Sequence, residues 1–225
     1  MHRQLHLHRA SINRKELSML QKMFLRLPIM ALLAASAMAP QANAQAAPSR
    51  DPTTVQDGIY SVEPSHTRVL FSVSHMGFTT WYGEFTNVSG SLNLAPKSLI
   101  HSTLEIHIPT GTVSTSNAKL NGELKSSDWF DTAKYPEILF TATKITQTGK
   151  NSAVVTGDLV FHGVTKPVTL KVKFNAAGIN PLDHKYTAGF EVSGEIKRSD
   201  FGVKTYLPLI GDDVGLIISA AFEHN

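Results

Sequence analysis

Residues 155–174 read VTGDLVFHGVTKPVTLKVKF, and this stretch decides the fold. On either side of the connection at residues 162–167, apolar side chains recur at every second position, and mostly polar ones fill the positions between them. A period of two is typical of a β-strand with one buried and one solvated face. The short Gly-containing link between two such runs favours neighbouring antiparallel strands.

The same alternation recurs along the rest of the chain, at residues 69–75, 104–108, 138–143, 188–197 and 214–222. Two further short connections, at residues 148–151 and 175–178, are polar or contain Gly. The pattern therefore predicts an all-β fold with about eight strands. We expect an antiparallel up-and-down barrel of the lipocalin-like type, because closing the sheet removes both of its edges. A β-sandwich is the alternative.

Residues 117–130 interrupt the alternation, and their apolar side chains sit near helical spacing. We expect a short helix or lid there.

The segments at the N-terminus also differ from the strands. Residues 24–39 read FLRLPIMALLAASAMA, follow a basic stretch and precede Ala42-Asn43-Ala44, which is the order of a cleaved signal peptide. We expect residues 1–44 to be removed, residues 45–57 to form a flexible tail, and residues 58–225 to form the barrel domain. A non-cleaved anchor is the alternative.

The composition excludes several classes of function. The 225 residues include no Cys, which excludes disulfides, Cys-ligated zinc, iron–sulfur clusters and a thiol nucleophile. Six of the 21 basic residues and one of the 18 acidic residues lie in residues 1–44, so the rest of the chain is slightly acidic. Nucleic acid is therefore not an expected partner. The His residues form no metal-ligand motif, so we expect no metal.

The inner face of the predicted barrel is almost wholly apolar. Eight strands enclose either a packed core or a lumen that holds one slim ligand, as in lipocalins. Small residues on the inner register, namely Ala142, Gly157, Ala188, Gly194 and Ala220, favour the lumen because they leave room. The candidate ligand-binding residues are Val69, Phe71, Val73, His75, Phe85, Leu104, Ile106, Trp129, Phe140, Leu170, Phe190, Val192, Arg198, Leu216 and Ile218.

Two of these candidates are polar. His75 falls on the apolar register, where its ring either binds a ligand headgroup or forms a structural hydrogen bond. Arg198 either faces a ligand anion or pairs with Asp200 or Glu195. No motif of a catalytic nucleophile or phosphate loop occurs, so we expect no enzyme and no catalytic residue. An enzyme acting on a lipid headgroup through His75, His66 and Arg198 is the alternative.

Several ordered segments resemble a known family. They are YSVEPSHTRVLFSVSHMG at residues 60–77, LKSSDWFDTAKYPEILF at 124–140, GDLVFHGVTKPVTL at 157–170, RSDFG at 198–202 and GDDV at 211–214. Together they are similar to the YceI-like family of exported, polyisoprenoid-binding, lipocalin-like proteins, from about residue 58 to residue 223. Many members carry Asp-x-His-Leu before the lid, and this chain has Asn121-Gly122-Glu123-Leu124 instead.

The resemblance implies an antiparallel barrel with a long prenyl chain in its lumen, no catalysis and a periplasmic location. We expect a carrier or sensor for an isoprenoid lipid such as a ubiquinone or a prenyl phosphate, with no cofactor other than that lipid. An accessory partner of a membrane redox protein is the remaining alternative. We also expect transient contact with a membrane or a membrane redox protein. The expected oligomeric state is a monomer or a homodimer.

Overall fold

The computed structural model describes residues 47–225, and the predicted signal peptide at residues 1–44 lies outside them. The described residues form ten strands, four short 3₁₀ turns and one α-helix, α2 (Ala118–Lys125). The strands are β1 (Gly58–Val62), β2 (Arg68–His75), β3 (Thr79–Phe85), β4 (Ser89–Leu94), β5 (Thr103–Pro109), β6 (Glu137–Gly149), β7 (Ser152–Phe161), β8 (Val164–Ile179), β9 (Tyr186–Lys197) and β10 (Ile210–His224).

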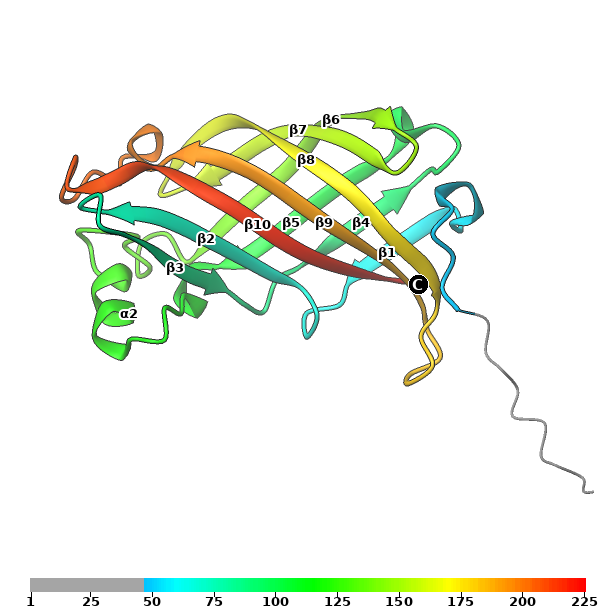
Figure 1. The fold of residues 1–225 in the computed structure, drawn as a ribbon, viewed down its shortest axis with the longest axis horizontal. Helices are drawn as coiled ribbons and strands as arrows, with labels where there is room; N and C mark the ends of the chain where they lie inside the picture. The colour runs from blue at the N-terminus through cyan, green and yellow to red at the C-terminus, as the bar shows by residue number, and fades with distance from the viewer. Residues whose placement is uncertain (1–46) are drawn as a thin grey trace, which may run out of the picture. The chain divides into compact units, whose positions relative to one another are not determined.

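The strands close into an antiparallel barrel (Figure 1). Their order is β1-β4-β5-β6-β7-β8-β9-β10-β2-β3, and a pairing of β1 with β10 closes the ring of eight. The long strand β10 makes this possible, because its last residues pair with β1 and its earlier part pairs with β2. The predicted all-β barrel is confirmed, and the hairpin of β2 and β3 adds two strands beside the closed ring.

Two local expectations about turns were wrong. Residues 175–178 do not connect two strands, because they lie inside β8, at a register shift between Phe174 and Ala176. The chain turns instead at residues 180–185. The connection predicted at residues 162–167 is shorter, because β8 already begins at Val164. A second register shift lies inside β10, between Ile210 and Val214. Asn and Gly favour bulges as well as turns, and the sequence pattern alone does not separate the two.

The helix and its flanks form the predicted lid, which we define as residues 117–130. Asn117 caps α2, because its side-chain Oδ1 accepts a hydrogen bond from the Leu120 N–H at 3.1 Å. The chain before the lid is tied to β3 by two backbone hydrogen bonds between Glu84 and Ser114, of 2.8 and 2.9 Å. Figure 1 shows α2 at the end of the barrel that holds the turn between β2 and β3, which we call the lid end.

Residues 47–57 do not form the loose tail that the sequence suggested. Ser49 pairs with Ala177 of β8 through two backbone hydrogen bonds of 2.8 and 2.9 Å, and Val55 is buried. The Gln56 N–H donates to the Tyr186 hydroxyl at 3.3 Å. These residues form a strap at the opposite end of the barrel, near the C-terminus (Figure 1), which we call the strap end. Pro-containing, polar sequence gave no sign of these contacts.

The strap end is filled by side chains. Tyr60 is fully buried, and its ring meets the His224 ring edge-on, with centroids 4.8 Å apart. The Tyr186 ring lies 6.4 Å from both. This aromatic cluster, with Val55 and the strap, plugs the barrel where β1 joins β10.

The small inner residues do not all leave room for a ligand. A Cβ on Gly157 would lie 2.5 Å from the Phe140 ring, and one on Gly194 would lie 2.6 Å from the Leu170 side chain. Ala188 is fully buried, and Ala142 packs against the core. Of the five small residues, Ala220 is the one that lines the cavity described below. The larger neighbours have taken most of the space that the small residues release.

Candidate functional site

The barrel encloses an apolar cavity of about 560 Å³. All fifteen candidate residues named from the sequence line it, and they come from seven strands, the lid and the turn after β9. That these residues contact a ligand stays a prediction, but their common orientation is a property of the fold. A volume of this size falls within the range of about 300–1,000 Å³ that is typical of small-molecule sites.

The cavity is apolar at the strap end. Its walls there include Leu94, which pairs with Gly58, and Phe222, which pairs with Val62. Phe190 stacks edge-on against Phe222, with ring centroids 5.9 Å apart. Such a surface offers a hydrocarbon chain contact without any polar group to desolvate.

Two polar side chains in the cavity wall are already satisfied by the backbone. The Thr67 Oγ1 accepts from the Ala221 N–H at 3.1 Å, and the Ser102 Oγ accepts from the Ala95 N–H at 2.9 Å. Both bonds hold neighbouring segments together. These two residues therefore serve the fold.

The other polar side chains of the wall gather at the lid end. Besides His75 and Arg198 they are Thr115, Asn117, Lys119 and Glu123, and the hydroxyl-bearing rings of Tyr82 and Tyr206 join them. A dry chamber with polar groups at one end fits a molecule with a polar head and an apolar tail.

Arg198 is the buried charge of this end, with 5% of its surface exposed. Its three guanidinium nitrogens donate to backbone carbonyls: Nε to Gly211 at 2.8 Å, one terminal nitrogen to Val203 at 3.1 Å and the other to Ile210 at 2.8 Å. Arg198 thus ties both sides of the connection between β9 and β10 together. The alternative pairing with Asp200 or Glu195 is not formed, and no ion pair among residues 47–225 includes Arg198.

The surroundings of Arg198 leave its charge only partly balanced. Burial lowers the pKa of Arg198, and the more distant Asp212 opposes this effect. The Asp212 carboxylate is itself held by the Ser199 N–H at 2.9 Å and the Ser199 hydroxyl at 2.8 Å. The Arg198 guanidinium lies over the Trp129 ring, 5.3 Å from its centroid. An aromatic face is a weak substitute for an anion.

Aromatic rings frame the lid end of the cavity. Trp129 from the lid meets Tyr206 from the connection after β9 at a centroid distance of 6.1 Å. On the other side, His75 of β2 lies against Trp81 of β3, with centroids 5.4 Å apart. His75 therefore packs on the Trp81 ring within the cavity wall, and it stays a candidate for contact with a ligand headgroup.

Sequence reasoning missed the polar residues of the lid, because a helix lies outside the strand alternation. Lys119 and Glu123 both line the cavity, one turn apart on α2. Asn121 accepts hydrogen bonds at its Oδ1 from the Thr115 N–H at 2.8 Å and the Thr115 hydroxyl at 2.7 Å. An amide oxygen thus anchors the start of the lid, and helical spacing from Asn117 was the signal that could have located these residues.

The structure does not bring together His75, His66 and Arg198, the three residues of the alternative in which an enzyme acts on a lipid headgroup. His66 lies at the opposite end of β2 from His75, is largely exposed and does not line the cavity, and its ring contacts Glu63 instead. His107 stands on the outer wall, where its ring bonds Glu105 and Glu137 at 3.0 Å each. Hydrogen bonds with Glu137 and then Glu105 raise the pKa of His107. Within residues 47–225 no three His, Asp or Glu side chains form a metal-binding group.

Comparison with known proteins agrees with this architecture. The model of the YceI-like domain family matches residues 60–222. The chain is 39% identical over 157 residues to "Protein YceI" of Escherichia coli, which covers 70% of this chain and 81% of the relative. No helix among residues 47–225 has the length and apolarity to cross a membrane.

Two solved structures are similar in fold. The Campylobacter jejuni YceI protein superimposes with a TM-score of 0.60 and 28% identity, over 68% of this chain and 90% of that chain. A polyisoprenoid binding domain from Saccharophagus degradans, described as implicated in plant cell wall breakdown, gives a TM-score of 0.56. At 18% identity, over 74% of this chain and 98% of that chain, this second likeness concerns the fold alone.

Proposed function

The chain belongs to the YceI-like family, and from this premise we propose that it is a periplasmic carrier that holds one long isoprenoid lipid in its barrel. The observation that carries the proposal is the cavity, which is apolar at the strap end and polar at the lid end. The name of the fold relative from Saccharophagus degradans, a polyisoprenoid binding domain, agrees with it. Binding, and not catalysis, is the activity that this arrangement supports.

The apolar walls supply the affinity in this proposal. Transfer of a hydrocarbon chain from water stabilises the complex by about 0.8 kcal/mol for each buried CH₂ group, before the cost of ordering the chain. A prenyl chain offers many such groups and no polar atom that the walls would leave unpaired. In this proposal the prenyl chain lies toward the strap end, beside Phe190 and Phe222, because the polar side chains there are already hydrogen-bonded to the backbone.

Arg198 and its neighbours select the head. A buried cation is costly unless a partner balances it, and the Arg198 guanidinium has carbonyls and a Trp ring but no bonded carboxylate. Its three bonds to carbonyls leave N–H groups on both terminal nitrogens. A prenyl phosphate, or the carbonyl oxygen of a quinone such as ubiquinone, would supply the missing acceptor. Lys119 adds a second cation to the same end.

Native mass spectrometry of the protein purified from its host tests the carrier role. We expect one intact lipid of isoprenoid mass for each protein molecule. Titration with prenyl alcohols of increasing length then measures the apolar contribution, and affinity should rise with length until the cavity is full. A processed lipid would point to catalysis, and affinity that does not change with length would overturn the proposal.

The Arg198→Ala variant tests the head. Affinity for prenyl phosphates should fall by about 1.5–3 kcal/mol at every chain length, because a charge-assisted hydrogen bond is lost. The matched control is Lys197→Ala, which removes a neighbouring cation that pairs with Asp213 at 2.6 Å and does not line the cavity. Equal losses in both variants would reduce Arg198 to a structural tie, and circular dichroism checks that the barrel is intact.

A further inference from the structure

An exposed apolar rim lies beside the lid end of the cavity. Phe78 in the turn after β2 is 86% exposed, and Tyr82 of β3 is 63% exposed. Tyr206 and Leu209, from the connection before β10, are 59% and 57% exposed, and Met76 is 49% exposed. Contiguous apolar surface of this kind is rare on a soluble protein unless something covers it.

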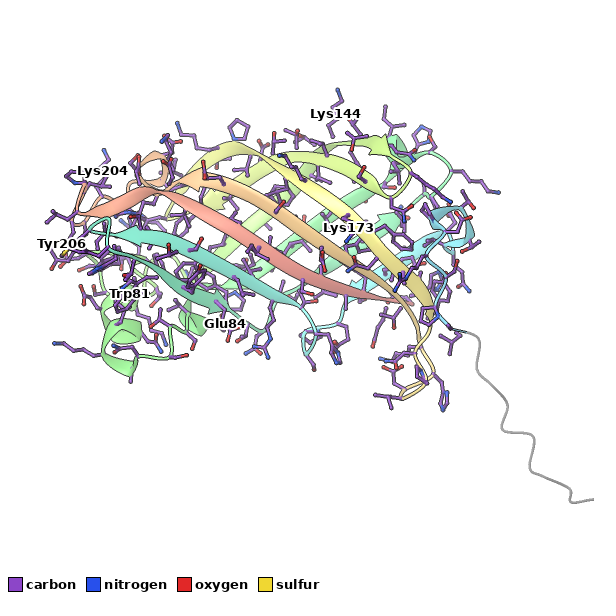
Figure 2. All side chains as sticks on the ribbon, viewed as in Figure 1. Trp81, Glu84, Lys144, Lys173, Lys204 and Tyr206 are labelled. Carbon is purple, nitrogen blue, oxygen red and sulfur yellow. The ribbon has the colours of Figure 1, made fainter. Side chains whose placement is uncertain are left out.

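The rim is one surface, because the two loops that carry it touch. The Met76 N–H donates to the Leu209 carbonyl at 2.7 Å, which joins the turn after β2 to the connection before β10. Figure 2 shows Trp81, Lys204 and Tyr206 at this same end of the barrel. Tyr82 and Tyr206 also line the cavity, so the rim is continuous with its entrance.

Two residues of the rim have an unusual backbone conformation. Met76 has φ of 54° and Tyr206 has φ of 60°, and both values lie in the left-handed region that favours Gly or Asn. Met76 and Tyr206 therefore stand at positions where Gly or Asn would be favoured. Such placement is typical of sites at which function outweighs local preference.

The charge of the rim selects among partners. Residues 76–83 and 202–211 contain a single charged side chain, the cation Lys204, and no carboxylate. Lys204 is exposed and lies at the same end of the barrel as Tyr206 (Figure 2). These two loops, with apolar and phenolic tips, one cation and no acid, are complementary to phospholipid headgroups, where Tyr rings sit at the boundary between hydrocarbon and water and Lys meets phosphate. The lid residues that line the cavity beside them add one cation and one acid, Lys119 and Glu123.

We propose that the lid end docks on a phospholipid bilayer through Met76, Phe78, Tyr82, Tyr206 and Leu209, with Lys204 on the lipid phosphates. This inference rests on the proposed function, because an isoprenoid that enters the cavity from a membrane has to leave the bilayer without crossing water. Docking by the rim places the cavity entrance against the lipid. The polar side chains His75 and Arg198 then stand at the level of the headgroups, and the apolar strap end points away.

Co-sedimentation with vesicles of phosphatidylethanolamine and phosphatidylglycerol tests the docking. The test variant is Phe78→Ser with Leu209→Ser, because both side chains are exposed and neither lines the cavity. The matched control is Ile100→Ser with Leu182→Ser, which removes two apolar side chains that are 72% and 88% exposed outside the rim. We expect the wild type and the control to bind alike, and the rim variant to bind weaker by about tenfold for each side chain.

A second measurement separates this inference from the proposed function. Binding of a short prenyl alcohol in vesicle-free buffer should be the same for the wild type and the rim variant, since the cavity is unchanged. If the wild type does not bind the alcohol, the carrier role is overturned, and the vesicle result is unaffected. A wild type that stays in the supernatant, or a rim variant that sediments as well as the control, would overturn the docking and point to a protein partner.

Discussion

Gly157 is a position at which one methyl group decides the packing. A Cβ there would lie 2.5 Å from the Phe140 ring and 2.5 Å from the Thr141 carbonyl oxygen, and the carbonyl belongs to the paired strand. Backbone at that distance has no way to move aside. We expect Gly157→Ala to lower the free energy of unfolding by about 1–3 kcal/mol, as measured by urea denaturation.

Gly122→Ala is the matched control for that change. Gly122 lies inside α2, and a Cβ there meets no atom within 4 Å. The same substitution should stabilise the helix by up to about 1 kcal/mol, because Ala has the higher helix propensity. Destabilisation of similar size at both positions would show that the crowding at Gly157 has no special effect.

Tyr60 predicts a loss of stability at alkaline pH. Burial raises the pKa of Tyr60 to about 12, above the ordinary value of 10.0, and its hydroxyl donates to the Gln56 carbonyl at 2.7 Å. Because the folded state favours the protonated phenol, its contribution is fully present below the unfolded pKa and is lost as pH rises from there through about 12. Denaturation curves across this alkaline range measure the loss.

Tyr60→Phe is the control for the alkaline transition. It should remove this part of the pH dependence while costing about 1 kcal/mol at neutral pH for the lost hydrogen bond. If the variant loses stability between these pH values as steeply as the wild type does, other groups, such as the Lys residues, cause the transition.

Single residues also mark what the sequence could not predict. The alternation placed Phe140 and Gly157 on one face, and both lie there. It did not reveal that Phe140 and Gly157 are diagonal neighbours on the paired strands β6 and β7. The Phe140 ring therefore fills the room that we expected beside Gly157. Register between distant strands is a tertiary property, and a lone strand pattern does not contain it.

At the scale of elements, the strand alternation has a direct test in β10. Ile218 lines the cavity, whereas its neighbour Ile217 is 61% exposed on the outer face. We expect Ile218→Asp to abolish prenyl binding and to destabilise the fold by several kcal/mol, because an unpaired carboxylate would enter an apolar wall. Ile217→Asp should leave both nearly unchanged, and binding and unfolding assays on the pair measure this.

The elements also differ in how well their sequences predict them. Long strands such as β9 and β10 were predicted from alternation alone, because each has one apolar face. The short strands β1, β3 and β4 were not, since each contains a Gly and few apolar residues at alternate positions, whereas β5, of the same length as β3, alternates clearly. The strap was missed for another reason: its contacts with β8 are backbone hydrogen bonds, which any sequence can make.

For the whole molecule, the consequence is a barrel with two unlike ends. The strap and the ring cluster of Tyr60, Tyr186 and His224 fill one end, while the lid, Arg198 and the apolar rim surround the other. The sequence of a single strand does not predict this difference between the two ends, because the difference arises from where the strap and the lid are attached. It predicts a fixed orientation of the lipid, with the head at the lid end and the tail toward the strap.

Ala220→Leu tests that orientation. Ala220 lines the cavity opposite Phe190, toward the strap end, so a larger side chain there should shorten the chamber without touching Arg198. Affinity for long prenyl phosphates should fall, and affinity for short ones should stay the same, when the graded series is titrated by fluorescence or calorimetry. The control is Ser219→Leu, an exposed neighbour on the outer face, which should change neither. If the head instead occupied the strap end, Ala220→Leu would weaken short and long chains equally, and the orientation would be reversed.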